Sequence, residues 1–364
     1  MKDKKCSHGE NGFTLIELLI SLLISMIVLF GTLKVFDSSQ KSYVVQEDVA
    51  ELQQNVRIAK MFLERDVRMA GAGISNLSFG GIATYPIEFE NDVDGTTGVA
   101  ATIASIVPGT DLLTIRYQNF GLSGCATGGT YPPCDNLPQL ILTSEMPTTA
   151  AVAIVVDDLT TAPYSAWDND CSCNGVNYTQ PQPGMPFIVT SPDGSQSAVL
   201  FQTSTLPNSN KIGNIANFTY NGVTYPNKVL NTFPAGSTVS FFQDNSIYRA
   251  VYYIEDEAGI PCLKRDTGIG GEIIAEYIED LQLAFGLDTD SDGVIDDWVS
   301  TADLTNTEKG QVRLVRMNIL GRTAHIQQNF TGQRPAVEDH AVGVSDSYRR
   351  RQLTVTVKVR NLGL

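Results

Sequence analysis

Five aspartates within ten residues form the clearest candidate ion site in this chain: Asp288, Asp290, Asp292, Asp296 and Asp297. Carboxylates this close together repel one another unless a cation neutralises them. Oxygen ligands at alternate positions are also the hard donors that Ca²⁺ prefers. The pattern therefore predicts a structural calcium site, with a solvated acidic turn as the alternative.

The surrounding residues exclude an EF-hand. An EF-hand loop ends in a bidentate Glu at its twelfth position, and here Val299 stands there. Gly293 can supply a sharp turn. We expect Asp296 or Asp297 to complete the ligand set, together with a backbone carbonyl near Val294.

Six cysteines raise the question of disulfides or a metal centre. One lies in the first twelve residues, and the others are Cys125, Cys134, Cys171, Cys173 and Cys262. Cys125 and Cys134 bracket a loop that contains Gly and Pro, so we expect them to pair. Cys262 is expected to join Cys171 or Cys173, which leaves one thiol free. Their spacing is irregular and no histidine lies nearby, which argues against zinc.

Catalytic motifs are missing from the sequence. The chain has three histidines, and none lies in a nucleophile or metal motif. It contains no GxxxxGK phosphate loop, no GxSxG elbow and no HExxH. The formal charge of -15 argues against nucleic-acid binding, which needs Lys and Arg to displace counterions. We therefore expect neither an enzyme nor a nucleic-acid partner.

Glu17 is a charged residue in an unusual place. It is the only charge in Phe13–Leu33, an apolar run that as a helix would be about 31 Å long, enough to cross a bilayer. Lys2, Lys4 and Lys5 precede the run and predict a cytoplasmic N-terminus. No Ala-x-Ala cleavage pattern follows it, so we expect the segment to be retained. A carboxylate within a membrane span needs a partner.

The residues around Glu17 supply a motif. Gly12-Phe13-Thr14-Leu15-Ile16-Glu17 resembles the type IV prepilin signature. The resemblance implies that a prepilin peptidase cleaves between Gly12 and Phe13 on the cytoplasmic side and that the amine of Phe13 is methylated. It also implies a partner for Glu17, namely the Phe13 amine of a neighbouring subunit, which would set the axial register of a filament.

One long helix is expected to carry this segment. No proline occurs before Pro86, and apolar residues continue at helical spacing beyond the membrane segment: Val45, Val49, Leu52, Val56, Ala59, Leu63, Val67 and Ala70. We predict a helix from about Thr14 to Ala70 that docks on its own head rather than forming a coiled coil. The polar residues between the apolar ones, Asp66 among them, are expected to be solvated.

The rest of the chain has short strand patterns. The predicted strands are 112–117, 248–254 turning through 255–259 into 261–265, 312–320, and 353–360 with strict alternation. Residues 120–245 are rich in loops, and no linker marks a second domain. We therefore expect an α+β fold, a long N-terminal helix packed on a C-terminal β-sheet-rich head.

Several later motifs resemble PilW-type minor pilins. They are Phe62–Gly71, Gly109–Tyr117, Ile278–Gln282 leading into Gly286–Asp290, and Val357–Leu362. This resemblance implies a pilin-like organisation: a leader (1–12), a membrane and filament-core helix (13–36), its amphipathic continuation (37–72) and a β-rich head (73–364).

The same resemblance implies a minor pilin that helps to assemble or initiate a type IV pilus. It would be held in the inner membrane with a periplasmic head and then move to the pilus at the cell surface. Its expected partners are other minor and major pilins, prepilin peptidase, the inner-membrane assembly machinery and membrane lipid. A J-type pseudopilin of type II secretion and a tip-located adhesin are the alternatives.

Overall fold

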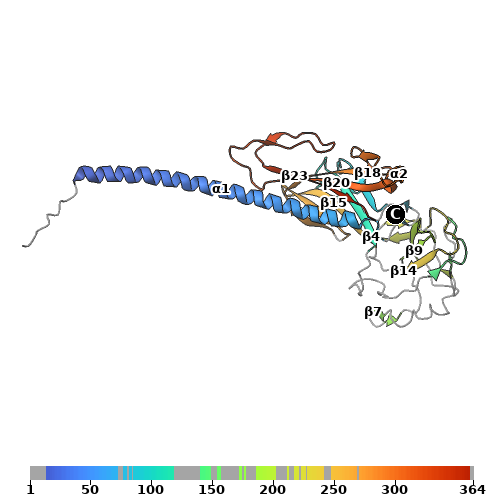
Figure 1. Ribbon diagram of the computed structural model, residues 1–364. Coiled ribbons are helices and arrows are strands. Elements are labelled where there is room, and N and C mark those ends of the chain that lie inside the picture. The colour runs from blue at the N-terminus through green and yellow to red at the C-terminus, as the bar shows by residue number, and fades with distance from the viewer. Residues whose placement is uncertain are drawn as a thin grey trace, which may run out of the picture.

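The expected α+β fold is confirmed: one long helix extends from a head built of β-sheets (Figure 1). The computed structural model describes residues 14–72, 77–79, 82–83, 85–118, 140–148, 154–156, 172–173, 176–177, 186–201, 211–212, 217–220, 223–226, 228–241, 247–268 and 270–360.

Helix α1, Leu15–Met69, has nearly the predicted bounds. Thr14 caps its first turn in a capping box with Glu17. The helix ends where Ala70 turns to extended backbone and Gly71 takes a φ of 76°, a left-handed value that suits glycine. The Gly71 N–H then donates to the carbonyl of Arg116, which fixes the end of the helix to the head.

The second half of α1 packs on the head through the predicted apolar stripe. Leu52, Val56, Ala59, Leu63 and Val67 are all at most 3% exposed. They face four strands of the head, because α1 contacts β4 (Leu112–Gln118), β17 (Gly271–Glu276), β20 (Val312–Arg322) and β23 (Arg350–Lys358). The expected docking within the same chain is therefore confirmed, and the helix covers the head as Figure 1 shows.

Two antiparallel sheets form the part of the head beneath the helix. The five-stranded sheet has the order β17-β16-β15-β4-β3, and the four-stranded sheet the order β19-β18-β20-β23. The strands of the first are β3 Ile87–Glu90, β4 Leu112–Gln118, β15 Ile247–Glu257, β16 Ile260–Asp266 and β17 Gly271–Glu276. Those of the second are β18 Ile278–Leu287, β19 Asp297–Val299, β20 Val312–Arg322 and β23 Arg350–Lys358.

The predicted strands are confirmed as β4, β15, β16, β20 and β23, with one correction. The turn expected at 255–259 is shorter, because β15 continues to Glu257. Only Ala258 and Gly259 form the turn, with φ values of 54° and 93°. Cross-strand pairing of Glu257 with Ile260 holds this tight hairpin.

One hydrophobic core lies between α1 and these two sheets. Asp111 links the sheets through the backbone: its carboxylate accepts the Leu283 N–H at 2.7 Å, and its own N–H donates to the Leu281 carbonyl. Burial raises the pKa of Asp111 to about 8. Nothing in the local sequence marks Asp111 as such a link.

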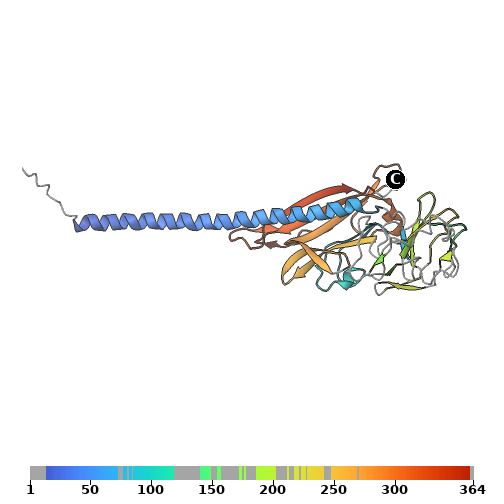
Figure 2. The same cartoon turned by 90° about the horizontal axis from the view of Figure 1, so that it is seen from below.

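A six-stranded sheet occupies the other part of the head, with the order β2-β1-β10-β9-β14-β5. Its strands are β1 Leu77–Phe79, β2 Ile82–Ala83, β5 Leu140–Ile141, β9 Pro186–Thr190, β10 Ser197–Phe201 and β14 Thr238–Phe241. It has a core of its own, centred on Phe187, Val189 and Phe233. The described parts of residues 120–245 thus include strands that the sequence patterns did not predict. In both views this sheet lies beyond the C-terminal end of α1 (Figures 1 and 2).

The remaining elements are short. Two are helical, the 3-10 turn η1 Ala100–Thr102 and the helix α2 Asn306–Gln311. The others form two-stranded sheets: β6 Ile154–Val155 with β11 Lys211–Ile212, β7 Ser172–Cys173 with β8 Val176–Asn177, β12 Phe218–Tyr220 with β13 Val223–Tyr225, and β21 Gly332–Gln333 with β22 Ser345–Asp346.

Most strands of the six-stranded sheet come from the segment of the chain between β4 and β15. Strand β4 ends at Gln118 and β15 begins at Ile247, and these two residues pair directly across the five-stranded sheet. The chain therefore leaves and re-enters the sheet at neighbouring points. Residues 119–246 are an insertion into a β-hairpin, and none of those that the structure describes belongs to the core beneath α1.

Candidate functional site

The first half of α1 is an apolar surface that the head does not cover. Its large side chains are mostly more than half exposed, Leu15 at 80% and Phe36 at 63% among them. By length and composition α1 can cross a membrane, and none of its most apolar window is buried. Burying so much apolar surface in lipid or against other helices is strongly favourable. This half of α1 is the candidate anchoring and assembly segment.

The few hydroxyls in this segment are satisfied within the helix. Ser21 donates to the Leu18 carbonyl at 2.9 Å, and Ser25 donates to the Ser21 carbonyl at 2.8 Å. Thr32 likewise donates to the carbonyl of Leu29 at 2.8 Å. Groups bonded in this way can enter an apolar environment without leaving an unpaired donor.

Glu17 lies at the exposed N-terminal end of the apolar segment. Its Oε2 accepts hydrogen bonds from the backbone N–H and the hydroxyl of Thr14, at 2.9 and 3.0 Å. These bonds hold the carboxylate against the helix N-terminus, where the dipole also favours negative charge. Among the described residues Glu17 forms no ion pair. Gly12 and Phe13 lie outside the described residues.

A buried carboxylate anchors the C-terminal end of α1. Asp66 is fully buried, so the expectation that it is solvated is wrong. It accepts hydrogen bonds from the Tyr252 hydroxyl at 2.7 Å and from Nε of Arg265 at 3.0 Å, while Arg65 binds its other oxygen. Burial and the Asp66 charge raise the pKa of Tyr252, which therefore stays protonated as a donor.

A second buried carboxylate lies nearer the apolar half. Asp48 is 4% exposed and accepts a hydrogen bond from the side chain of Gln327 at 2.7 Å. The Nδ1 of His325 lies 3.0 Å from its other oxygen. Sequence patterns did not single out either contact with Asp48.

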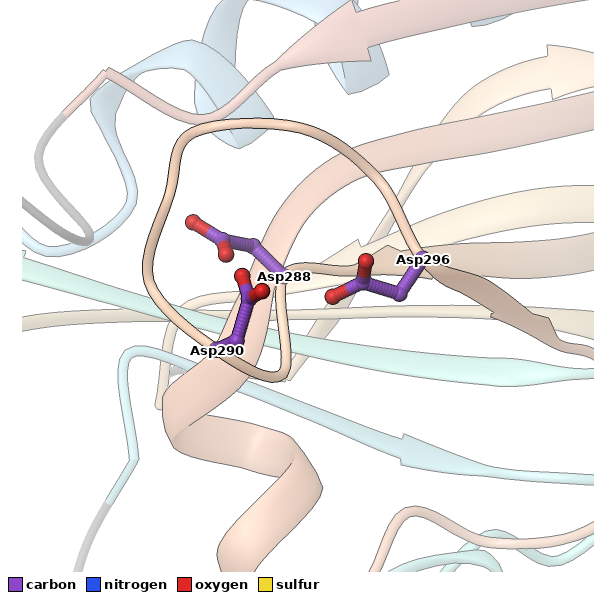
Figure 3. Close-up of side chains that lie close together, drawn as sticks. All are labelled: Asp288, Asp290 and Asp296. Atoms are coloured by element: carbon purple, nitrogen blue, oxygen red, sulfur yellow. The ribbon is translucent and has the colours of Figure 1, made fainter.

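The acidic loop follows β18 and closes on itself. The Asp296 N–H donates to the Leu287 carbonyl at 2.9 Å, so the loop begins and ends at the sheet. Within it, carboxylate oxygens of Asp288, Asp290 and Asp296 all lie within 4.8 Å of one another (Figure 3). Hydrogen bonds from Thr289 hold the pKa of Asp296 below its ordinary value.

The structure brings together three of the five predicted ligands. The other two bind backbone N–H groups: Asp292 accepts from Val294, and Asp297 accepts from Trp298, both at 2.7 Å. Of the two candidates for completing the set, Asp296 is the one that joins the group. The flanks of the loop are strands, in agreement with the exclusion of an EF-hand.

The cysteine expectations are largely left open. Cys125, Cys134 and Cys171 lie outside the described residues, as does the side chain of Cys173. Cys262 is a free thiol, 1% exposed, so the pairing expected for it is not formed. It sits on β16 between two neighbouring strands, and its Sγ lies 3.4 Å from the Ile260 carbonyl. Burial raises its pKa to about 11.

The helix α1 is apolar in its first half, amphipathic in its second half and docked on a β-rich head. This arrangement is that of a pilin-like protein anchored through its N-terminal helix. Residues 7–33 match the prokaryotic N-terminal methylation motif, a stretch that contains Gly12, Phe13 and Glu17. Residues 251–361 match the family described as type IV pilus-assembly protein W. The chain is thus similar to PilW-type pilins that carry a prepilin signature, as the sequence motifs indicated.

The second match covers the strands from β15 to β23, which form most of the two sheets beneath α1. It does not extend to the six-stranded sheet. No curated protein and no solved structure matches the chain. Together the matches support a minor pilin related to the type IV pilus.

Proposed function

We propose that this chain is a minor pilin that takes part in assembling or initiating a type IV pilus. The observation that carries the proposal is the exposed apolar half of α1, which is continuous with the half docked on the head. Such a helix can anchor the subunit in the inner membrane and later exchange lipid for the helices of other pilins. The match to a pilus-assembly family supports the same role.

The proposed route begins with a cytoplasmic N-terminus and a periplasmic head, as the leader lysines favour. Prepilin peptidase removes residues 1–12 and leaves Phe13 as a methylated N-terminus. The inner-membrane assembly machinery then passes the subunit into a filament of minor and major pilins that reaches the cell surface.

Glu17 is proposed to set the register of the subunit. Its carboxylate is exposed at the end of the helix, where the positive Phe13 amine of a neighbouring subunit can reach it. In an apolar filament core, an unpaired carboxylate is costly and a paired one much less so. Pairing of this kind favours one axial position over others.

Replacing Glu17 by Gln tests this role. The amide oxygen can still accept from Thr14, so the cap is kept while the charge is lost. We expect peptidase cleavage to continue and the amount of this subunit in sheared pili to fall about tenfold. Glu47→Gln, an exposed carboxylate on the same helix, is the matched control and should incorporate normally. The readouts are the mass of the N-terminal peptide and immunoblots of pilus fractions.

Incorporation of Glu17→Gln at the level of the parent would contradict the register role. Intact residues 1–12 in cells with active peptidase would contradict the prepilin assignment itself. Loss of protein secretion rather than pili on deletion of the gene would instead indicate a J-type pseudopilin.

The insertion favours a second candidate function, a tip-located adhesin or ligand-binding pilin. Residues 119–246 build most of a sheet with its own core, at the end of the head away from the apolar segment (Figure 2). None of the described residues of the insertion belongs to the core beneath α1. Such a segment is suited to presenting a binding surface.

A further inference from the structure

We propose that the loop between β18 and β19 is a calcium site whose side-chain ligands are Asp288, Asp290 and Asp296. The three carboxylates come from the nine-residue loop 288–296 and lie close together inside it (Figure 3). The inference concerns the head alone and does not depend on incorporation into a pilus.

An unpaired buried oxygen is the observation that separates this loop from an ordinary acidic turn. Asp288 is only 2% exposed, and its Oδ1 is buried with no hydrogen-bond partner among the described residues. Its other oxygen accepts from the Gly293 N–H at 3.2 Å and lies 3.3 Å from Nε of Arg313. A buried anionic oxygen without a partner is strongly unfavourable, and a bound cation removes that cost.

The loop conformation holds the carboxylates in place. Oδ2 of Asp296 accepts from the backbone and hydroxyl of Thr289, and Oδ1 of Asp290 accepts from the Asp292 N–H. Ser291 and Gly293 adopt left-handed backbone, with φ values of 66° and 87°, and so make the loop tight. In Asp290, one oxygen is used by the loop and the other has no hydrogen bond among the described contacts.

Charge points to a divalent ion. Three carboxylates carry three negative charges, and among the described ion pairs only Arg313 joins the group. The remainder is two negative charges, which one divalent cation would neutralise. A site made only of carboxylate oxygens is not the kind that zinc or copper prefers, because these metals favour nitrogen and sulfur ligands.

Calcium fits the site better than magnesium. Asp290 and Asp296 are exposed, so the site is open to water and to further oxygens on one side. Ca²⁺ accepts six to eight oxygens at flexible angles, whereas Mg²⁺ demands a near-ideal octahedron and dehydrates reluctantly. An open three-carboxylate site is typical of weak extracellular calcium binding, with a Kd of about 0.1–1 mM.

A bound ion would stiffen one corner of the head. The Asp288 N–H donates to the Gln311 carbonyl at 2.9 Å, at the junction of α2 and β20. The ion would thus connect the end of β18, the start of β19 and this junction through Asp288 and Asp296. Calcium should then stabilise the folded chain by mass action.

The test uses the full chain in detergent, stripped with EDTA and then titrated with CaCl₂. We expect a Kd in the range above by calorimetry and a rise in Tm of about 2–5 °C at 10 mM Ca²⁺. The same concentration of MgCl₂, and NaCl at equal ionic strength, should give less than half of that rise. Equal rises in all three salts would show simple screening of an acidic turn and would overturn the proposal.

Two isosteric variants of the same loop test the ligand set. Asp290→Asn should weaken calcium binding at least tenfold. Asp292→Asn removes the same charge from the same loop but not from the converging group, and it should change the Kd less than threefold. Equal weakening by both variants would overturn the ligand set, and an absence of saturable binding by the parent chain would overturn the site.

Discussion

Two buried carboxylates on α1, Asp48 and Asp66, hold the helix to the head at separate points. Each accepts bonds from strands or loops far away in sequence, so each contact fixes the rotation of the helix about its axis. Removing either acceptor would leave buried donors unpaired, which costs more than an exposed ion pair contributes.

The contact between Asp48 and His325 should make the stability of the head depend on pH. The hydrogen bond to Asp48, aided by the charges of Asp48 and Glu51, raises the pKa of His325 above its ordinary value of about 6.5. Because the folded-state pKa is raised, the stabilisation is fully present below about pH 6.5 and is lost as the pH rises through the folded pKa. In measurements from pH 5.5 to 8.5, the Tm should therefore fall as the pH rises above about 6.5.

His325→Gln provides the control for this titration. Glutamine keeps a donor for Asp48 but does not titrate, so its Tm profile should be flatter than that of the parent above pH 6.5. Parallel profiles for the two chains would show that another group causes the pH dependence.

Sequence patterns explain only part of these contacts. The apolar stripe predicted which face of α1 is buried, because Leu52 to Val67 recur at helical spacing. Asp48 and Asp66 lie on that same face, three residues after Val45 and Leu63 respectively. Their position on this face favoured burial, whereas their charge favoured exposure to solvent. The donors that make burial possible come from residues far away in the sequence, which no local pattern reveals.

At the level of elements, the close approach of α1 to β20 depends on Gly321. A Cβ at this position would lie 2.7 Å from Leu52 Cδ1 and also 2.7 Å from Val56 Cγ2. Both side chains are almost fully buried and have little room to move. Glycine is therefore required where the helix crosses the strand.

Gly321→Val should lower the free energy of unfolding by about 1–3 kcal/mol, since the added methyl groups force the helix from the sheet. Urea denaturation of the detergent-solubilised chain would measure the change. Gly310→Ala is the matched control, because nothing lies within 4 Å of its Cβ position and it is in the short helix α2. It should be neutral or slightly stabilising, and an unchanged midpoint for Gly321→Val would contradict the packing argument.

Strands were predictable where they are long and alternate, and not elsewhere. The clear alternation in 353–360 predicted β23, and the acidic loop was found because its carboxylates are close in sequence. The six-stranded sheet was missed because it joins strands of two to five residues from widely separated segments. The choice of Asp296 over Asp297 could not be predicted either, since it depends on hydrogen bonds formed only in the folded loop.

At the level of the whole molecule, the direct pairing of Gln118 with Ile247 makes the insertion separable. Replacing residues 119–246 by Asn-Gly would close β4 and β15 as an ordinary two-residue hairpin. Because no described residue of the insertion belongs to the core beneath α1, we expect the shortened chain to fold, with a cooperative thermal transition retained. Circular dichroism on heating would measure this.

The shortened chain also separates the two candidate functions. Normal pili with lost surface attachment would favour the adhesin role for the insertion. Loss of pili from a chain that still folds would place the insertion in assembly itself. An aggregated chain without a thermal transition would contradict the separability of the two cores.

The unbroken course of α1 has a mechanical consequence. Its 55 residues form a rod about 80 Å long without a proline or a break. Tension applied to the head passes into the rod through many side-chain contacts that share the load, and then along a single column of backbone hydrogen bonds. The weakest link under load is therefore the exposed half of α1, where no other described element of this chain shares the strain. Packing by other subunits would reinforce that stretch.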